Sequence, residues 1–167
     1  MTEAAAPDPS TALAVRVVEG LAARGLTLAT AEASVGGMIG HLITNVPGAS
    51  RVFTGGIAPY ARGPKVGLLG LSDDMLTAEG SVSEAAALGL ARGVRAVMRA
   101  DLAIAETGVA SPTGNPLRPA GMYFVALVAA DRERVLPCWF EGGREDIKRQ
   151  ASEAALRLVL DYLDETR

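Results

Sequence analysis

The sequence predicts an α/β fold, a three-layer α/β/α sandwich around a mixed, mostly parallel sheet. Through most of the chain, strand-like segments alternate with segments of helical periodicity, which is typical of parallel sheets covered by helices. Nearer the C-terminus two strand-like segments follow one another and indicate a hairpin, which adds antiparallel strands. The 167 residues fit one domain, which we expect over 10–167 after a disordered tail over 1–9.

Apolar periodicity predicts the helices. Leu13, Val17 and Leu21 recur every four residues, and Gly25 follows as a stop, which predicts a helix over 11–24. Ser83 can cap a long helix that runs to about residue 99. The remaining expected helical segments are 36–44, 65–69, 72–79 and 144–164.

Short apolar or alternating segments predict the strands. Residues 26–31 alternate, and residues 102–106 form an apolar run. The other expected strands are 52–58, 121–129 and 135–140. Residues 107–119 are rich in Gly, Pro, Ser, Thr and Asn, and we expect a loop there.

Composition excludes several classes of function. The net charge of −3 disfavours a nucleic-acid surface, which normally needs a basic excess. With one histidine and one cysteine, the chain lacks the ligands of an ordinary zinc site, and we expect neither a metal nor a cofactor. The N-terminus lacks the features of a signal peptide, and the apolar run over 122–130 is too short to span a bilayer. We therefore expect a cytoplasmic protein without a membrane segment.

Glycine-rich and hydroxyl-rich loops mark a candidate site, because ligands bind beyond the carboxyl ends of strands in open α/β sheets. The amides of Gly36 and Gly37 at a helix start suit an anion, although a tight turn explains them equally well. Arg144 opens the last helix, where the helix dipole disfavours a cation. A bound phosphate would explain that position, and so would an ion pair with Glu141 or Glu145.

A serine and a lysine provide candidate chemistry. Lys65 is one of only two lysines, and a lysine desolvated in a pocket can act as a general base toward a serine hydroxyl. Ser50 is the candidate serine, and Tyr60 lies between the two in the sequence. The alternatives are that Ser50 only caps a turn and that Lys65 is an ordinary surface residue.

Together these motifs resemble the CinA C-terminal domain, the competence/damage-inducible family that includes the nicotinamide mononucleotide deamidases. The resemblance covers about residues 10–164. The matching motifs, in family order, are Glu32 with Gly36-Gly37, Thr44 with Pro47-Gly48-Ala49-Ser50, Tyr60 with Lys65, Leu69-Gly70, Gly80 with Val82-Ser83, Thr107-Gly108-Val109-Ala110 with Pro112 and Gly114, Pro119 with Gly121, and Gly143-Arg144.

The resemblance implies a hydrolase that converts nicotinamide mononucleotide to nicotinate mononucleotide and ammonia without a metal, in pyridine nucleotide recycling. We also expect a homo-oligomer, because the chain is apolar and the alanine-rich faces of its helices can pack closely. It implies Ser50 as nucleophile, Lys65 as its base and Tyr60 as an assisting group. Arg144 and the amides of the glycine pair would hold the phosphate. The implied substrate-binding residues are Glu32, Ser34, Gly36, Gly37, Thr107, Gly108 and Arg144.

The first motif departs from the family pattern. The family turn usually reads Glu-Ser-Cys-Thr-Gly-Gly, whereas this chain has Glu32-Ala33-Ser34-Val35-Gly36-Gly37. Two alternatives to the hydrolase therefore stay open. One is a paralogue that binds a nucleotide without hydrolysing it. The other is a non-enzymatic interaction module linked to competence or DNA damage.

Overall fold

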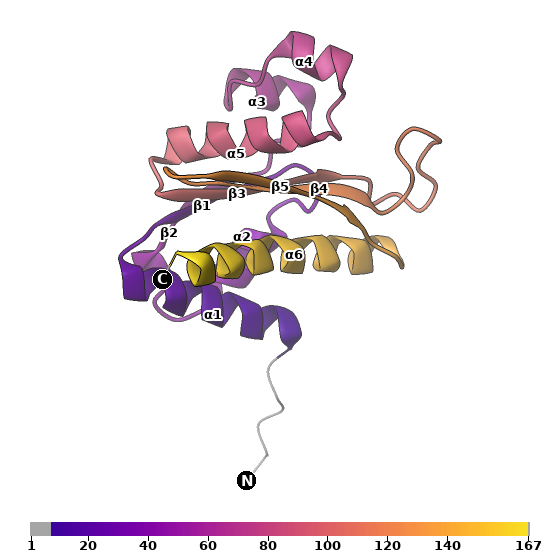
Figure 1. Ribbon diagram of the computed structural model, residues 1–167. Coiled ribbons are helices and arrows are strands. Elements are labelled where there is room, and N and C mark those ends of the chain that lie inside the picture. Colours follow the sequence, from indigo (N-terminus) through magenta and orange to yellow (C-terminus); the bar gives the residue numbers. More distant parts are fainter. Residues whose placement is uncertain (1–7, 167) are drawn as a thin grey trace.

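The computed structural model describes residues 8–166, so most of the expected N-terminal tail lies outside the described residues. Figure 1 shows a sheet between two helical layers. The strands are β1 (Leu28–Glu32), β2 (Phe53–Ile57), β3 (Leu102–Gly108), β4 (Met122–Val128) and β5 (Glu133–Trp139). The helices are α1 (Pro9–Arg24), α2 (Met38–Thr44), α3 (Arg62–Gly67), α4 (Asp73–Ala78), α5 (Glu84–Met98) and α6 (Arg144–Glu165), with a short 3₁₀ turn, η1, at Ala49–Arg51.

The sheet is mixed and has the strand order β2-β1-β3-β4-β5. Strand β1 pairs in parallel with β2 and β3, whereas β4 runs antiparallel to both β3 and β5. All strands except β4 therefore point the same way. Helices α1, α2 and α6 cover one face, and α5 covers the other with α3 and α4 outside it (Figure 1). The predicted three-layer α/β/α architecture is confirmed.

Alternation along the strands gives the two faces of the sheet side chains of different size. Large residues from β1, β3 and β4 pack against α1, α2 and α6, among them Leu28, Leu102, Ile104, Val125 and Leu127. The opposite face is mostly alanine, and it packs against alanines of α5: Ala29, Ala31, Ala103, Ala105 and Ala126 meet Ala86, Ala87 and Ala91. Small side chains on both sides let α5 lie close to the sheet, which explains how an alanine-rich sequence fills its core.

Several element ends differ from the sequence prediction for local reasons. Helix α1 begins at Pro9 because Asp8 caps it, its carboxylate accepting the N–H of Thr11. Helix α2 begins only at Met38, since the two preceding glycines have positive φ angles of 70° and 105°. Strand β3 continues to Gly108, because its last residues still pair with β4.

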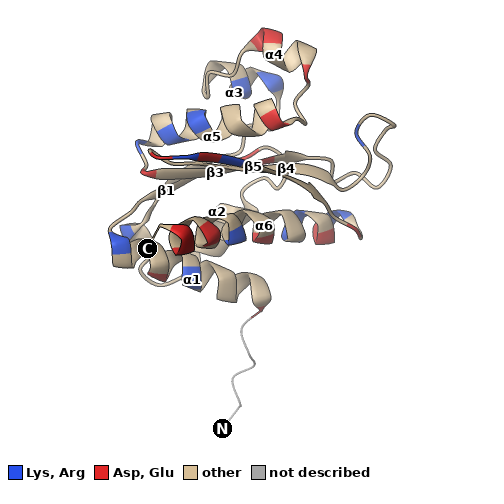
Figure 2. Ribbon diagram, viewed as in Figure 1, with Lys and Arg blue, Asp and Glu red and all other residues tan. Residues whose placement is uncertain are grey.

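Charged residues lie mainly on the helices and on β5, as the coloured ribbon in Figure 2 shows. Strand β5 forms one edge of the sheet, and it carries Glu133, Arg134 and Pro137. Arg134 pairs with Glu165 of α6 at 3.0 Å. Charges and a proline on an edge strand disfavour pairing with another sheet.

Within residues 8–166, no helix is both long enough and apolar enough to cross a membrane.

Two buried carboxylates hold the turn between β1 and α2. Glu32 and Glu106 are paired residues at the ends of β1 and β3, and they are 2% and 0% exposed. The Glu32 carboxylate accepts the N–H groups of Gly37, Ile39 and Gly40 at 2.8–2.9 Å. The side chain of Glu32 therefore caps the first turn of α2 from inside the protein.

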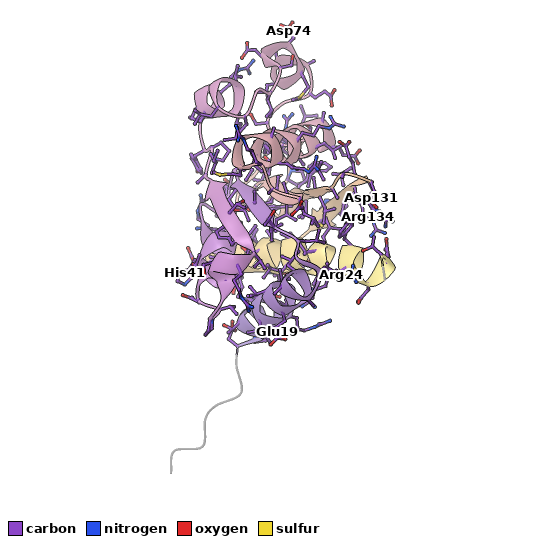
Figure 3. The ribbon with its side chains drawn as sticks, turned by 90° about the vertical axis from the view of Figure 1, so that its left-hand side faces the viewer. Glu19, Arg24, His41, Asp74, Asp131 and Arg134 are labelled. Carbon is purple, nitrogen blue, oxygen red and sulfur yellow. The ribbon has the colours of Figure 1, made fainter. Side chains whose placement is uncertain are left out.

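We predict that Glu32→Ala lowers the free energy of unfolding by about 3 kcal/mol or more, because three amide donors lose their buried acceptor. Urea denaturation followed by circular dichroism measures the change. Glu19→Ala, on the exposed outer side of α1 (Figure 3), is the matched control and should change stability by less than about 0.5 kcal/mol. Equal stability of the two variants would contradict the capping role.

Candidate functional site

A hollow of about 240 Å³ lies where the carboxyl ends of β1 and β3 meet the start of α6. This is the edge where open α/β sheets bind ligands. The lining combines hydroxyl groups, two cationic side chains and small apolar residues. Its members are Ala33, Ser34, Tyr60, Lys65, Ser81, Val82, Thr107, Gly108, Val109, Ala110, Ser111 and Arg144.

Lys65 enters this hollow from the short helix α3. The carbonyls of Pro64 and Lys65 accept N–H groups from residues 68, 69 and 71, which fixes the backbone after the lysine. Arg62 joins α3 to α4 through a 2.7 Å bond from its Nε to Asp73. Lys65 is only 5% exposed. Its amine makes no hydrogen bond or ion pair with any residue of the described chain, although it lines the hollow.

Burial lowers the pKa of Lys65 below the ordinary lysine value, because the charged amine loses hydration. The negative charge of Glu106 opposes this effect and favours the protonated form. Desolvation is the larger influence, so the pKa stays lowered. A buried lysine without a hydrogen-bond partner, beside a hollow, can exchange a proton with a bound molecule.

Glu106 and Ser34 form a polar cluster at the floor of the site. The Ser34 hydroxyl donates to the Glu106 carboxylate and lies 3.0 Å from the Tyr123 hydroxyl. The same carboxylate accepts the N–H groups of Ser34 and Val35 at 2.8 and 3.0 Å. Burial raises the pKa of Glu106 despite these bonds, and burial also raises the pKa of Tyr123 to about 12. The cluster fixes the Ser34 hydroxyl and gives it a nearby proton acceptor.

Arg144 stands at the opposite rim of the hollow, as the first residue of α6. The guanidinium lies 3.5 Å from the Tyr60 hydroxyl and forms no ion pair with any residue from 8 to 166. The ion pair with Glu141 or Glu145 that the sequence left open is therefore not formed. Both Arg144 and Tyr60 are exposed, so the cation is accessible to an anionic ligand.

Thr107 and Gly108 form part of the wall at the end of β3. The Thr107 hydroxyl donates to the Ser81 carbonyl at 2.5 Å, which ties the segment before α5 to the strand. A β-carbon at position 108 would overlap the ring of Tyr123. Gly108 is therefore needed for the close approach of Tyr123, which lies against the Ser34 cluster.

Ser50 is not in this hollow, which corrects the prediction that it meets Lys65. It lies in η1, before β2, and it lines a separate hollow with Pro47 and Phe53. Residue 53 pairs with Leu28 at the start of β1, whereas the site follows the end of β1. Five strand residues separate the two ends, roughly 16 Å at the usual rise. Ser50 is exposed, as a turn residue can be.

The predicted anion site at the glycine pair is also corrected. Glu32 does not line the hollow; its carboxylate occupies the start of α2 and accepts the N–H of Gly37. A phosphate would have to displace this buried side chain. Gly36 and Gly37 do not line the hollow either. Their positive φ angles shape the turn, which agrees with the tight-turn alternative.

The structure adds two functional candidates that the sequence analysis missed, Glu106 and Tyr123. Glu106 ends an apolar strand segment, and its charge in that context was an available signal. Tyr123 stands in an apolar strand, where an aromatic residue normally belongs to the core, and no pattern distinguished it. Among residues 8–166, no group of three or more His, Cys, Asp or Glu residues is placed to hold a metal ion.

Comparison with known proteins supports one family. The model of the CinA C-terminal domain matches residues 10–163. A CinA-like protein of Syntrophotalea carbinolica is 41% identical over 90% of this chain, and a putative competence-damage inducible protein of Moorella thermoacetica is 41% identical over 83%. These alignments cover 37% and 34% of the two relatives, so the chain spans about a third of their length.

Solved structures agree with this assignment. The competence/damage inducible protein of Agrobacterium tumefaciens has a TM-score of 0.90 at 30% identity and covers 97% of this chain and 99% of its own. The competence damage-inducible protein A of Klebsiella pneumoniae has a TM-score of 0.92 at 26% identity, with coverage of 96% and 100%. Sequence match and fold therefore lead to the same conclusion: the chain belongs to the CinA C-terminal domain family.

Proposed function

We propose that this chain is an amidohydrolase that converts nicotinamide mononucleotide to nicotinate mononucleotide and ammonia. Membership of the CinA C-terminal domain family is consistent with an amidase role. The choice of nicotinamide mononucleotide as the substrate follows from the resemblance of the ordered sequence motifs to those of the deamidases in this family. The reaction needs a proton acceptor for the attacking oxygen, a donor for the departing ammonia and a cation for the phosphate. Lys65 and Arg144 meet these needs within one hollow.

The burial and the unpaired amine of Lys65 are the main support for this function. Its side chain is nearly buried, its amine has no hydrogen-bond partner among the described residues, and burial lowers its pKa. Burying a cation without a partner costs stability, so a structural role is a poor explanation for this residue. A general base, in contrast, benefits from a pKa close to neutral pH.

In the proposed mechanism Arg144 binds the phosphate from the rim, with the Tyr60 hydroxyl beside it. The nicotinamide group then extends into the hollow, so that its carboxamide lies near Lys65. Neutral Lys65 takes up the proton that the attacking oxygen loses. The resulting ammonium returns this proton to the carboxamide nitrogen, the carbon–nitrogen bond breaks, and ammonia leaves.

A second candidate function, binding of a nucleotide without hydrolysis, is favoured by one observation. Ala33 lines the hollow at the position where the family turn usually carries serine. A methyl group there supplies no hydroxyl for the reaction. Under this alternative, nicotinamide mononucleotide raises the melting temperature of the protein, but neither ammonia nor nicotinate mononucleotide is formed.

We expect Lys65→Met to reduce the rate of ammonia release from nicotinamide mononucleotide by at least about a hundredfold, the usual contribution of a general base. Methionine keeps an apolar stem in the same space and removes a desolvated charge, so the melting temperature should not fall. Lys148→Met removes the chain's other lysine, which lies on α6 outside the hollow, and should keep full activity. Full activity of Lys65→Met would exclude Lys65 as the base.

Arg144→Ala tests the phosphate contact. We expect KM for nicotinamide mononucleotide to rise about tenfold to a hundredfold, as for the loss of one charge-assisted hydrogen bond. Nicotinamide riboside lacks the phosphate, so its kcat/KM should not differ between the wild type and this variant. An equal loss on both substrates, measured by steady-state ammonia release, would contradict a phosphate contact at Arg144.

The pH dependence follows from the lowered pKa of Lys65. The neutral amine is the active base, so kcat/KM should rise with pH and level off above the pKa of Lys65. Because burial lowers this pKa, the rise should lie at lower pH than for a lysine with the ordinary pKa of 10.5. A pH series of kcat/KM for nicotinamide mononucleotide measures the limb, and an activity that falls across the same range would contradict a neutral base.

A further inference from the structure

We propose that Ser34 supplies the attacking oxygen, and that Glu106 positions Ser34 and passes its proton toward Lys65. The inference rests on the proposed amidohydrolase function and deepens it. It is needed because Ser50 lies at the other end of β2, while Ala33 presents only a methyl group to the hollow.

Ser34 is the hollow's hydroxyl with a carboxylate partner. The side chain of Thr107 donates to a backbone carbonyl, and the Ser111 hydroxyl is 3.1 Å from that of Thr113. Ser34 instead donates to the buried Glu106 carboxylate, which can accept its proton directly. An attacking hydroxyl needs such an acceptor within hydrogen-bond distance.

The geometry around Ser34 also holds the hydroxyl in place. Glu106 binds both the N–H and the hydroxyl of Ser34, so the backbone and the side chain of this residue are fixed by one carboxylate. The Tyr123 hydroxyl lies 3.0 Å from the serine oxygen on another side. Ser34 is half-buried, so part of the residue remains accessible from the hollow. Such fixed placement lowers the entropic cost of attack.

Glu106 is also the acidic group that acts electrostatically on Lys65. Its carboxylate is hydrogen-bonded to the hydroxyl of Ser34 and acts on the Lys65 amine through its charge alone. Burial raises the pKa of Glu106 and lowers that of Lys65, which brings the two groups closer in proton affinity. Since no hydrogen bond joins the two side chains, the proton would pass between them through a water molecule that enters the hollow.

The proposed reaction passes through an ester on Ser34. The Ser34 oxygen bonds to the carboxamide carbon while its proton passes to Glu106 and, through a water molecule in the hollow, on to neutral Lys65. Lys65 returns the proton to the nitrogen, the carbon–nitrogen bond breaks, and ammonia leaves an ester on Ser34. Water then attacks the ester and loses a proton along the same route. That proton restores the Ser34 hydroxyl as the ester bond breaks, which frees nicotinate mononucleotide.

Ser34→Ala and Ser50→Ala form a matched pair for the test. We expect Ser34→Ala to lower kcat for nicotinamide mononucleotide by at least roughly a thousandfold, and Ser50→Ala to change it less than twofold. Acid quench of the wild type during turnover, followed by tryptic digestion and fragmentation mass spectrometry, should place the acyl mass on Ser34. Both serines fall in the same tryptic peptide, residues 25–51, so fragmentation distinguishes them within one spectrum.

Glu106→Gln tests the proton relay through the pH dependence of the reaction, which a purely structural role of Glu106 would leave unchanged. The substitution removes the negative charge that favours protonated Lys65. We therefore expect kcat to fall and the rising limb of the pH profile to move to lower pH. An unchanged kcat and an unmoved limb would overturn the relay. Glu106→Asp, which keeps the charge, should leave the limb near its wild-type position.

Failure of this inference is distinguishable from failure of the proposed function. Wild-type turnover by Ser34→Ala, together with loss of activity in Lys65→Met, would overturn the role of Ser34 and leave the amidohydrolase standing. An acyl mass on Ser50 would do the same. A wild-type protein that releases no ammonia would instead overturn the proposed function, and the role of Ser34 with it.

Discussion

The two buried carboxylates at the ends of β1 and β3 determine the geometry on which the site depends. Neighbouring parallel strands bring Glu32 and Glu106 side by side, and both residues are buried. Each carboxylate is stabilised by backbone N–H groups from the same short segment, residues 34–40. Because unpaired buried charges are so costly, these bonds leave the segment little freedom. The position of Ser34 follows from this constraint.

The layers of the fold then bring distant segments to the same edge of the sheet. Alanines on one face allow α5 to approach closely, and α3 and α4 lie outside it (Figure 1). Lys65 reaches the hollow from α3, whereas Arg144 comes from α6 in the opposite layer. The hollow is thus lined from both helical layers and from the strand ends. An amine, a hydroxyl and a guanidinium from separate segments meet only because the sheet lies between those layers.

Sequence patterns were sufficient for the fold, because alternation and helical periodicity report directly which face of an element is buried. They also located Lys65, Tyr60, Thr107 and Arg144 in loops or helix starts that converge. They failed for Ser50, since closeness in sequence to Lys65 does not reveal that β2 separates the two. They failed for Glu32 because its carboxylate accepts the backbone N–H groups at the start of α2 instead of binding a ligand. A sequence pattern does not show which way a buried side chain points.

A titration of the Lys65 amine decides whether this side chain can act as the base of the reaction. The chain has only two lysines, so lysine labelled with ¹⁵N at its side-chain nitrogen gives two signals, and Lys65→Met assigns them. We expect Lys65 to lose its proton below the ordinary lysine value of 10.5, and we expect nicotinamide mononucleotide to shift its signal. A Lys65 amine that titrates at or above the ordinary lysine value, with a signal indifferent to the nucleotide, would contradict its role as the base.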